Sequence, residues 1–378
     1  MIKTYNIDPV WQSYNDNEIE KFRQLIKDGH DVNGLGRDGH SLIEHILTDY
    51  DQIDKNIKFF DELINDDIDF RSIIKQKFLL SIAATNPHKK SIHYIKKLIK
   101  FNIDINSFGT GLGPSPEPCT YNSYRKVYEP PIFQSVPMLS MRNKFNDYYY
   151  LLLKKNPDLE ICNHNGETII NYLIFENEVI GINQYNFYSL ISKMIKQGAD
   201  PTQRSYNNGC NSLHELCKAP NTSLNYKKLF DLFLKHGCDI NSVDFDGCTP
   251  LQYAFIYRNL EAIKILIKNG VDINKHGKFN MPVIFQAAAY NNLESFNIFF
   301  ENNAILTHIL DNDNNILHIM LKSESYNEHF YTKILDKNPE LLLMKDIFGK
   351  TPIDIINNIR IKSVKSSLLS LVKKYQKF

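Results

Sequence analysis

The sequence has little of what marks a disulfide-stabilised, nucleic-acid-binding or membrane-spanning protein. Its six cysteines in 378 residues show no paired C-x-x-C spacing and are too sparse for a disulfide scaffold, which favours a reducing cytosol. Lysine and arginine number 44 against 43 aspartate and glutamate, so no surplus charge attracts nucleic acid. No run approaches the ~20 apolar residues that span a bilayer, and residues 1–20 lack the apolar core of a signal peptide. We therefore expect a cytoplasmic chain without nucleic-acid or membrane partners.

One glycine-rich stretch, GTGLGPSPEPC at residues 109–119, has the composition of a phosphate-binding loop. Glycines let backbone N–H groups approach an anion, but this works only where a strand precedes the loop and a helix follows it. The residues upstream predict the end of a helix and an extended turn, and the three prolines downstream cannot continue a helix. The sequence therefore predicts no phosphate site here, and we expect no cofactor.

Two short phrases recur along the chain. One ends an amphipathic helix at Gly or Asn, as in IKILIKNGVDIN (263–274) and FDLFLKHGCDIN (230–241). The other opens a helix, as in DFDGCTPLQYAF (244–255). The apolar residue after the T-P-like pair of the second phrase marks each copy, and it recurs at Ile43, Leu80, Ile132, Ile170, Leu213, Leu251, Val283, Leu317 and Ile353.

The phrases have a direct physical meaning. Thr249 can cap a helix N-terminus, and Pro250 at the first helical position loses no hydrogen bond, so Leu251 begins the buried stripe. Gly270 suits the left-handed residue that ends a helix. Each unit is thus predicted as helix, turn, helix and an outward finger, and such units stack because none can bury its own apolar face.

These phrases resemble the ankyrin repeat family, whose unit of about 33 residues carries T-P-L-H-x-A and ends in G-A-D-V-N. The best single match is DGCTPLQYAFIYRNLEAIKILIKNGVDIN at residues 246–274, and the resemblance runs from about residue 16 to the end. It implies an all-α solenoid of about nine or ten helix-turn-helix repeats, a protein partner and no catalytic activity. With the heavy use of Asn, Ile and Lys, it is also similar to ankyrin effectors that intracellular bacteria deliver into host cells, and to repeat proteins of large viruses and amoebae.

One gap between copies exceeds its neighbours, and the excess falls at residues 107–130. We expect N-terminal repeats at residues 1–106, a Gly/Pro/Tyr-rich insertion at 107–130, and C-terminal repeats with a basic capping helix at 131–378. An insertion in a finger projects from one face of a solenoid, which is often the binding face. A disordered connector is the rival interpretation of this segment.

Aromatic side chains on the insertion, the fingers and the groove-facing helices are the expected partner contacts, because Tyr and Arg are enriched at interaction hot spots. For Tyr257 and Tyr290, structural packing between repeats is the rival explanation. The predicted contacts are Tyr121, Tyr124, Arg125, Tyr128, Phe245, Tyr257, Phe279 and Tyr290.

Three other functions are open to the sequence. Cys210, His214 and Cys217 have a spacing that could hold a metal, but the resemblance places His214 and His318 at the histidine of T-P-L-H, which hydrogen-bonds within and between repeats. We expect no metal. An enzyme could build its site from the 107–130 insertion and neighbouring fingers, with Cys119 or a Cys162–His164 pair as nucleophile.

The third alternative is a membrane-associated adaptor. The last twenty residues, 359–378, are basic and amphipathic, which suits either a membrane surface or an acidic partner. The same stripe is what the closing helix of a solenoid needs, and we favour that capping role. We expect the chain to be a monomer.

Overall fold

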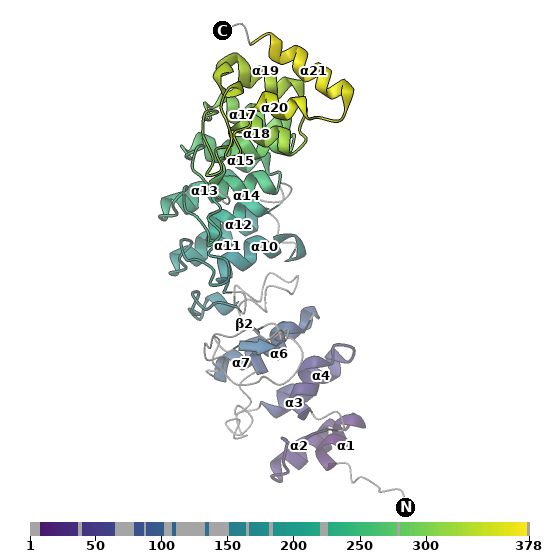
Figure 1. Cartoon of the computed structure of the whole chain (residues 1–378). Helices are drawn as coiled ribbons and strands as arrows, with labels where there is room; N and C mark the ends of the chain where they lie inside the picture. Colours follow the sequence, from purple (N-terminus) through teal and green to yellow (C-terminus); the bar gives the residue numbers. More distant parts are fainter. Residues whose placement is uncertain are drawn as a thin grey trace, which may run out of the picture. The chain divides into compact units, whose positions relative to one another are not determined.

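The structure is a computed structural model, whose helices and strands are labelled in Figure 1, and it divides into two compact units. Unit 1 comprises Met1–Asp200 with Ser205–Asn207, and unit 2 comprises Pro201–Arg204 with Asn208–Phe378. The residues that the structure describes are 8–36, 40–64, 79–86, 88–101, 108–110, 133–135, 151–163, 166–180, 184–219, 226–277 and 280–375. Within these ranges, no helix combines the length and the apolar character that crossing a bilayer requires.

Unit 1 is built from helix pairs and one small antiparallel sheet. Its core is a cluster of buried apolar side chains that includes Tyr14, Phe59, Phe60 and Tyr94. Its elements are α1 (Pro9–Asn15), α2 (Ile19–Lys27), α3 (Leu42–Thr48), α4 (Ile53–Leu63), α6 (Leu79–Thr85), η1 (Lys89–Ser91), α7 (Ile92–Leu98), η2 (Ile99–Phe101), β1 (Phe108–Thr110), β2 (Phe133–Ser135), α10 (Ile169–Ile180) and α11 (Gln184–Lys196).

Unit 2 repeats a pair of helices. The first helix of each pair follows an irregular finger, and the second runs back after a tight turn. Its elements are α12 (Ser212–Lys218), α13 (Tyr226–Lys235), α14 (Pro250–Ile256), α15 (Leu260–Lys268), α16 (Val283–Ala289), α17 (Leu293–Glu301), α18 (Ile316–Lys322), α19 (Glu328–Lys337), η4 (Pro339–Leu342), α20 (Pro352–Asn357) and α21 (Lys362–Lys373).

The helices of unit 2 form two rows (Figure 1). In the first row, α12, α14, α16, α18 and α20 each pack against the next helix in that order. In the second row, α13 packs against α15, and α19 packs against α21. Every pair therefore buries its apolar stripe against a neighbouring pair, as expected for a solenoid.

The first-row helices begin where polar side chains cap them. Thr249 accepts a hydrogen bond from the Gln252 N–H at 3.2 Å, and the Gln252 side chain accepts one from the Thr249 N–H at 3.0 Å. Thr351 and Asp354 form the same reciprocal capping box on α20. The predicted roles of Thr249, Pro250 and Leu251 are confirmed, as is the left-handed Gly270, whose φ is +78°.

One predicted repeat was displaced by a single residue. The sequence analysis placed the apolar residue that marks this repeat at Val283, with Pro282 at the first helical position. In the structure Pro282 is itself the N-cap, so α16 begins at Val283 and the buried residue equivalent to Leu251 is Ile284. The prediction was wrong because this finger has no Thr to cap the helix. With the correction, residues 251, 284 and 317 follow at equal intervals of 33.

The predicted helical solenoid is confirmed, with one local exception around the insertion. Ile132 was predicted to stand in the first turn of a helix that continues through the following residues, but Phe133–Ser135 is strand β2, and it pairs antiparallel with β1. Thr110 lies opposite Phe133 in this pairing, and Ile132 itself lies outside the described residues. Residues 110 and 133 therefore lie next to each other, so the segment between them starts and ends at neighbouring points of the structure. The sequence analysis missed this pairing because its partners are 23 residues apart and each strand is only three residues long.

Candidate functional site

Three of the predicted contact residues lie exposed on unit 2. Phe245, Tyr257 and Tyr290 have exposed fractions of 64%, 54% and 77%. Large aromatic side chains that stay exposed in a folded repeat array are candidates for partner contact. The remaining predicted contacts, Phe279 and the insertion residues Tyr121, Tyr124, Arg125 and Tyr128, lie outside the described residues.

Tyr257 and Tyr290 occupy equivalent positions on neighbouring repeats. Each is the C-cap of a first-row helix, Tyr257 of α14 and Tyr290 of α16, with nearly the same backbone angles. Tyr257 stacks on Tyr253 with ring centroids 6.2 Å apart, and Tyr290 lies 6.4 Å from the buried ring of Phe255. Each tyrosine thus packs one side of its ring on α14 and leaves much of its surface open, so packing and exposure coexist at these residues.

Phe245 is held on the finger that precedes α14. Its N–H donates to the Asn208 carbonyl at 2.9 Å, which ties it to the preceding finger. Its ring covers Gly209, where an added Cβ would come within 2.6 Å of the ring, and the Arg204 guanidinium lies 5.4 Å from the ring centroid. Arg204 in turn donates to the carbonyl of Gly209 at 2.9 Å. Two adjacent fingers therefore fix one exposed aromatic ring.

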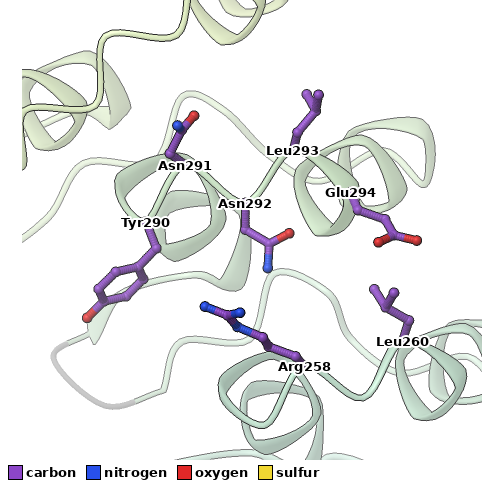
Figure 2. A pocket seen from close by; sticks show the side chains of 7 residues that line it. All are labelled: Arg258, Leu260, Tyr290, Asn291, Asn292, Leu293 and Glu294. Carbon is purple, nitrogen blue, oxygen red and sulfur yellow. The ribbon is translucent and has the colours of Figure 1, made fainter.

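A shallow pocket of about 390 Å³ lies beside Tyr290 (Figure 2). Arg258 and Leu260, at the turn between α14 and α15, form one side, and the turn between α16 and α17 forms the other. Its full lining is Arg258, Leu260, Tyr290, Asn291, Asn292, Leu293 and Glu294. Among the described residues, neither the exposed Arg258 nor the exposed Glu294 has an ion-pair partner. The pocket thus offers an aromatic wall, a cation and an anion.

The sequence analysis found only Tyr290 of this pocket. The signal that could have located this pocket is a repeated triplet, Y-R-N at 257–259 and Y-N-N at 290–292, which marks the same turn in two neighbouring repeats. The middle residue of each triplet is left-handed, with φ of +55° at Arg258 and +53° at Asn291. Asparagine tolerates this conformation, whereas arginine pays a steric cost that glycine would avoid. Glu324, which follows the C-cap of α18, has the same conformation with φ of +57°, so the left-handed residue belongs to the turn of the repeat.

The predicted hydrogen-bonding role of His214 is confirmed. Its Nε2 lies 3.2 Å from the carbonyl oxygen of Cys248, and its Nδ1 lies 3.3 Å from the N–H of Asn211. Burial lowers the pKa of His214 to about 4 and raises the pKa of Cys210 to about 11. A metal ligand must present a free ring nitrogen or a thiolate, so these contacts favour a structural role. Among the described residues, no three His, Cys, Asp or Glu side chains cluster as metal ligands.

A lysine joins each of two first-row helices to its fingers. Lys218 at the end of α12 bonds the carboxylate of Glu215 at 2.8 Å and lies 3.3 Å from the Cys210 sulfur. Lys322, at the same place on α18, bonds Asn314 at 2.7 Å and Asp346 at 3.0 Å. These ammonium groups neutralise buried carboxylates and fix the fingers, which makes them structural.

The cysteine nucleophiles considered from the sequence have little support among the described residues. Cys119 and His164 lie outside them. Cys162 is half-buried, its sulfur lies 3.5 Å from the Glu160 carbonyl, and burial raises its pKa. A raised pKa keeps the thiol protonated at neutral pH and therefore a weak nucleophile.

Comparison with known proteins assigns the repeats. A protein-family profile described as "Ankyrin repeats (3 copies)" matches residues 179–277. Residues 179–277 of this chain therefore carry ankyrin repeats. A segment of 134 residues is 28% identical to the ankyrin repeat protein FPV031 of Fowlpox virus (strain NVSL), and the match spans 35% of this chain and 36% of that relative. The chain thus matches about a third of the length of this curated relative.

A solved structure is also similar to part of the chain. It is the ankyrin repeat domain of Bcl-3, described as a unique member of the IkappaB protein family, with 16% identity and a TM-score of 0.46. The similarity covers 62% of this chain and 97% of that domain. Ankyrin repeats are interaction modules that bind unrelated proteins, so the repeats matched at residues 179–277 indicate a scaffold for protein binding without naming the partner.

Proposed function

We propose that this protein is an interaction scaffold whose unit 2 binds a partner protein through Phe245, Tyr257, Tyr290 and the pocket beside Tyr290, together called the aromatic surface. The observation that carries the proposal is that these three rings stay exposed while their backbones are fixed by caps and finger contacts. A rigid, exposed aromatic side chain gains contact area on binding and loses little rotamer entropy.

The pocket supports the same proposal. Binding hot spots combine an aromatic anchor with polar groups that fix orientation, and here Tyr290 adjoins Arg258 and Glu294. Ion pairs with a partner would neutralise these two side chains.

Several finer points of this proposal come from the sequence alone. The insertion residues Tyr121, Tyr124, Arg125 and Tyr128, and Phe279 of the finger before α16, extend the aromatic surface in our proposal. We further propose that the chain acts as a monomer in the cytoplasm, and that the partner is a protein of a host cell if the chain is an effector.

Affinity capture with the full chain tests the proposal. The double variant Tyr257→Ala with Tyr290→Ala should lose the captured partner, with a binding free energy weaker by about 2 kcal/mol, in the range of hot-spot truncations. Ile305→Ala is the matched control, because Ile305 is also half exposed but follows α17 in the second row. Affinity for the identified partner is then measured by isothermal titration calorimetry.

Two outcomes would contradict the proposal. In one, the double variant binds the partner as tightly as the parent chain. In the other, Ile305→Ala weakens binding equally, which would indicate non-specific adhesion to exposed apolar groups. Circular dichroism melts of each variant show whether any loss reflects unfolding.

A further inference from the structure

The last repeat of unit 2 carries a strong positive charge that the chain as a whole does not. Residues 343–375 contain seven basic side chains and two acidic ones, a net charge of +5, whereas the whole chain has a net charge of +1. The basic residues are Lys345, Lys350, Arg360, Lys362, Lys365, Lys373 and Lys374. A local excess of one sign attracts groups of the opposite sign.

Both acidic side chains of this repeat are already used inside it. The buried carboxylate of Asp346 accepts from the ammonium of Lys322 at 3.0 Å and from two backbone N–H groups of its own turn. Asp354 accepts from the N–H and the hydroxyl of Thr351 at 2.9 and 2.8 Å, as the capping box of α20 requires. Lys345 and Lys350 interact with Asp354 only at longer range, which helps to lower its pKa, and among the described residues neither lysine forms an ion pair.

Apolar side chains lie exposed among these cations. Ile347 and Phe348, at the tip of the finger before α20, have exposed fractions of 61% and 78%, and Leu343 and Ile361 are also exposed in the same repeat. The finger is ordered: Asp346 accepts the N–H groups of Phe348 and Lys350 at 3.0 Å. An ordered apolar tip between two lysines is unusual for surface that contacts only water.

This tip is equivalent in position to Phe245. The N–H of Ile347 donates to the Asn312 carbonyl of the preceding finger at 3.2 Å, just as the N–H of Phe245 donates to Asn208. The Phe348 ring also lies 6.0 Å from the ammonium of Lys322, at the end of first-row helix α18. The tip is therefore built into the same row of fingers as the aromatic surface, which favours a protein partner over a lipid surface.

We infer that the last repeat docks an acidic protein segment, whose carboxylates face Lys345, Lys350 and the basic residues of α21 while its apolar side chains cover Ile347 and Phe348. This inference rests on the proposed function and names the chemistry of the partner. Charge complementarity raises the association rate and selects acidic partners, and the apolar contact at the tip supplies affinity that salt does not screen.

The first experiment uses the full chain and defined peptides. The probe is a short fluorescein-labelled peptide with several glutamates around one leucine and one phenylalanine, and the counter-probe has lysine at each glutamate. Fluorescence polarisation should show binding of the acidic peptide alone, weakening at least about fivefold when salt rises from low concentration to about 0.5 M, because the Debye length falls several-fold.

Charge reversal identifies the site. Lys345→Glu with Lys350→Glu should weaken acidic-peptide binding about tenfold at low salt, and Phe348→Ser should weaken it at both salt concentrations. Lys264→Glu with Lys268→Glu makes the same charge change on exposed positions of α15 and should have less than about a twofold effect. Because Lys345 and Lys350 help to lower the pKa of Asp354 in the α20 cap, Lys362→Glu with Lys373→Glu on α21 serves as a second site variant.

Three results would overturn the inference. If the lysine peptide binds as tightly as the acidic peptide, the positive charge of the last repeat does not select the partner. If the α15 control variant weakens acidic-peptide binding equally, the loss is caused by the net charge of the chain and not by a site on the last repeat. Binding of phosphatidylserine vesicles that depends on Lys345 and Lys350, without peptide binding, would assign the surface to anionic lipid. If the partner is still captured in a Tyr257-dependent way, the proposed function stands when this inference fails.

Discussion

The imidazole of His214 on α12 reaches the carbonyl oxygen of Cys248, 34 residues later, on the finger that precedes α14. The Nδ1 of the same ring lies 3.3 Å from the Asn211 N–H and 2.7 Å from the Asn211 side-chain oxygen. His318 repeats the contact with Lys350 at 2.9 Å. At the same position of α14, the Gln252 amide donates to the Met281 carbonyl at 3.3 Å. Three side chains thus tie a helix to the next finger in the same way.

We predict that acid destabilises the fold through these histidines. Burial lowers the pKa of His214 to about 4 and also lowers the pKa of His318. The neutral rings therefore stabilise the folded state above pH 6.5, and this contribution is lost as pH falls from about 6.5 toward 4. His214 alone should account for about 3 kcal/mol of unfolding free energy over this range. Urea unfolding followed by circular dichroism at several pH values measures the loss.

The matched variant for the acid prediction is His214→Gln with His318→Gln. Glutamine keeps the capping box and the donor, as Gln252 shows, but does not titrate in this range. This variant should flatten the pH dependence, and an unchanged slope would mean that other groups cause the acid sensitivity.

Gly209→Ala should both destabilise unit 2 and weaken partner binding. Gly209 has a φ of +75°, and an alanine Cβ there would lie 2.6 Å from the Phe245 ring, so the ring must move. The control is Gly270→Ala, where φ is +78° and no atom lies within 4 Å of an added Cβ. We expect Gly270→Ala to cost about 1–2 kcal/mol in unfolding free energy and Gly209→Ala about 1 kcal/mol more. Only Gly209→Ala should weaken partner binding. If both variants change the affinity equally, Phe245 is not part of the binding surface.

Arg258→Gly should stabilise the fold while weakening binding. The left-handed conformation costs a residue with a Cβ about 1–2 kcal/mol, and the greater freedom of glycine in the unfolded chain returns only part of this. A net gain of about 0.5 kcal/mol is expected in thermal or urea unfolding. Glu324→Gly relieves the same conformation, with φ of +57°, but Glu324 lies outside the pocket. It should stabilise equally and leave binding intact, so loss of binding in both variants would argue against a specific role of Arg258.

The insertion makes a separate prediction from the sequence. Changing Tyr121, Tyr124, Arg125 and Tyr128 together to alanine should weaken partner binding by at least about 1–2 kcal/mol and leave the thermal midpoint nearly unchanged. The β1–β2 pairing supports the second part, because the segment between residues 110 and 133 starts and ends at neighbouring points, where chain length costs little. If the quadruple variant binds like the parent chain, the segment is a connector.

The sequence determined where most helices of this protein begin and end, because those signals are local. A capping Thr, an adjacent Pro and a Gly after the last turn act within a few residues, which is why Thr249, Pro250 and Gly270 could be assigned before any contact was known. Where the local signal is missing, as at Pro282 without a capping Thr, the predicted register was wrong by one residue.

Tertiary structure alone decided which distant residues meet. The pocket joins the turn after Tyr257 to the turn after Tyr290, and its shape depends on how α14 packs against α16. The pairing of Thr110 with Phe133 and the covering of Gly209 by Phe245 likewise depend on residues more than twenty positions apart. Local preferences select helices and turns, but these contacts form only when neighbouring repeats stack and bury their apolar faces, so the exposed surface is known only from the folded array.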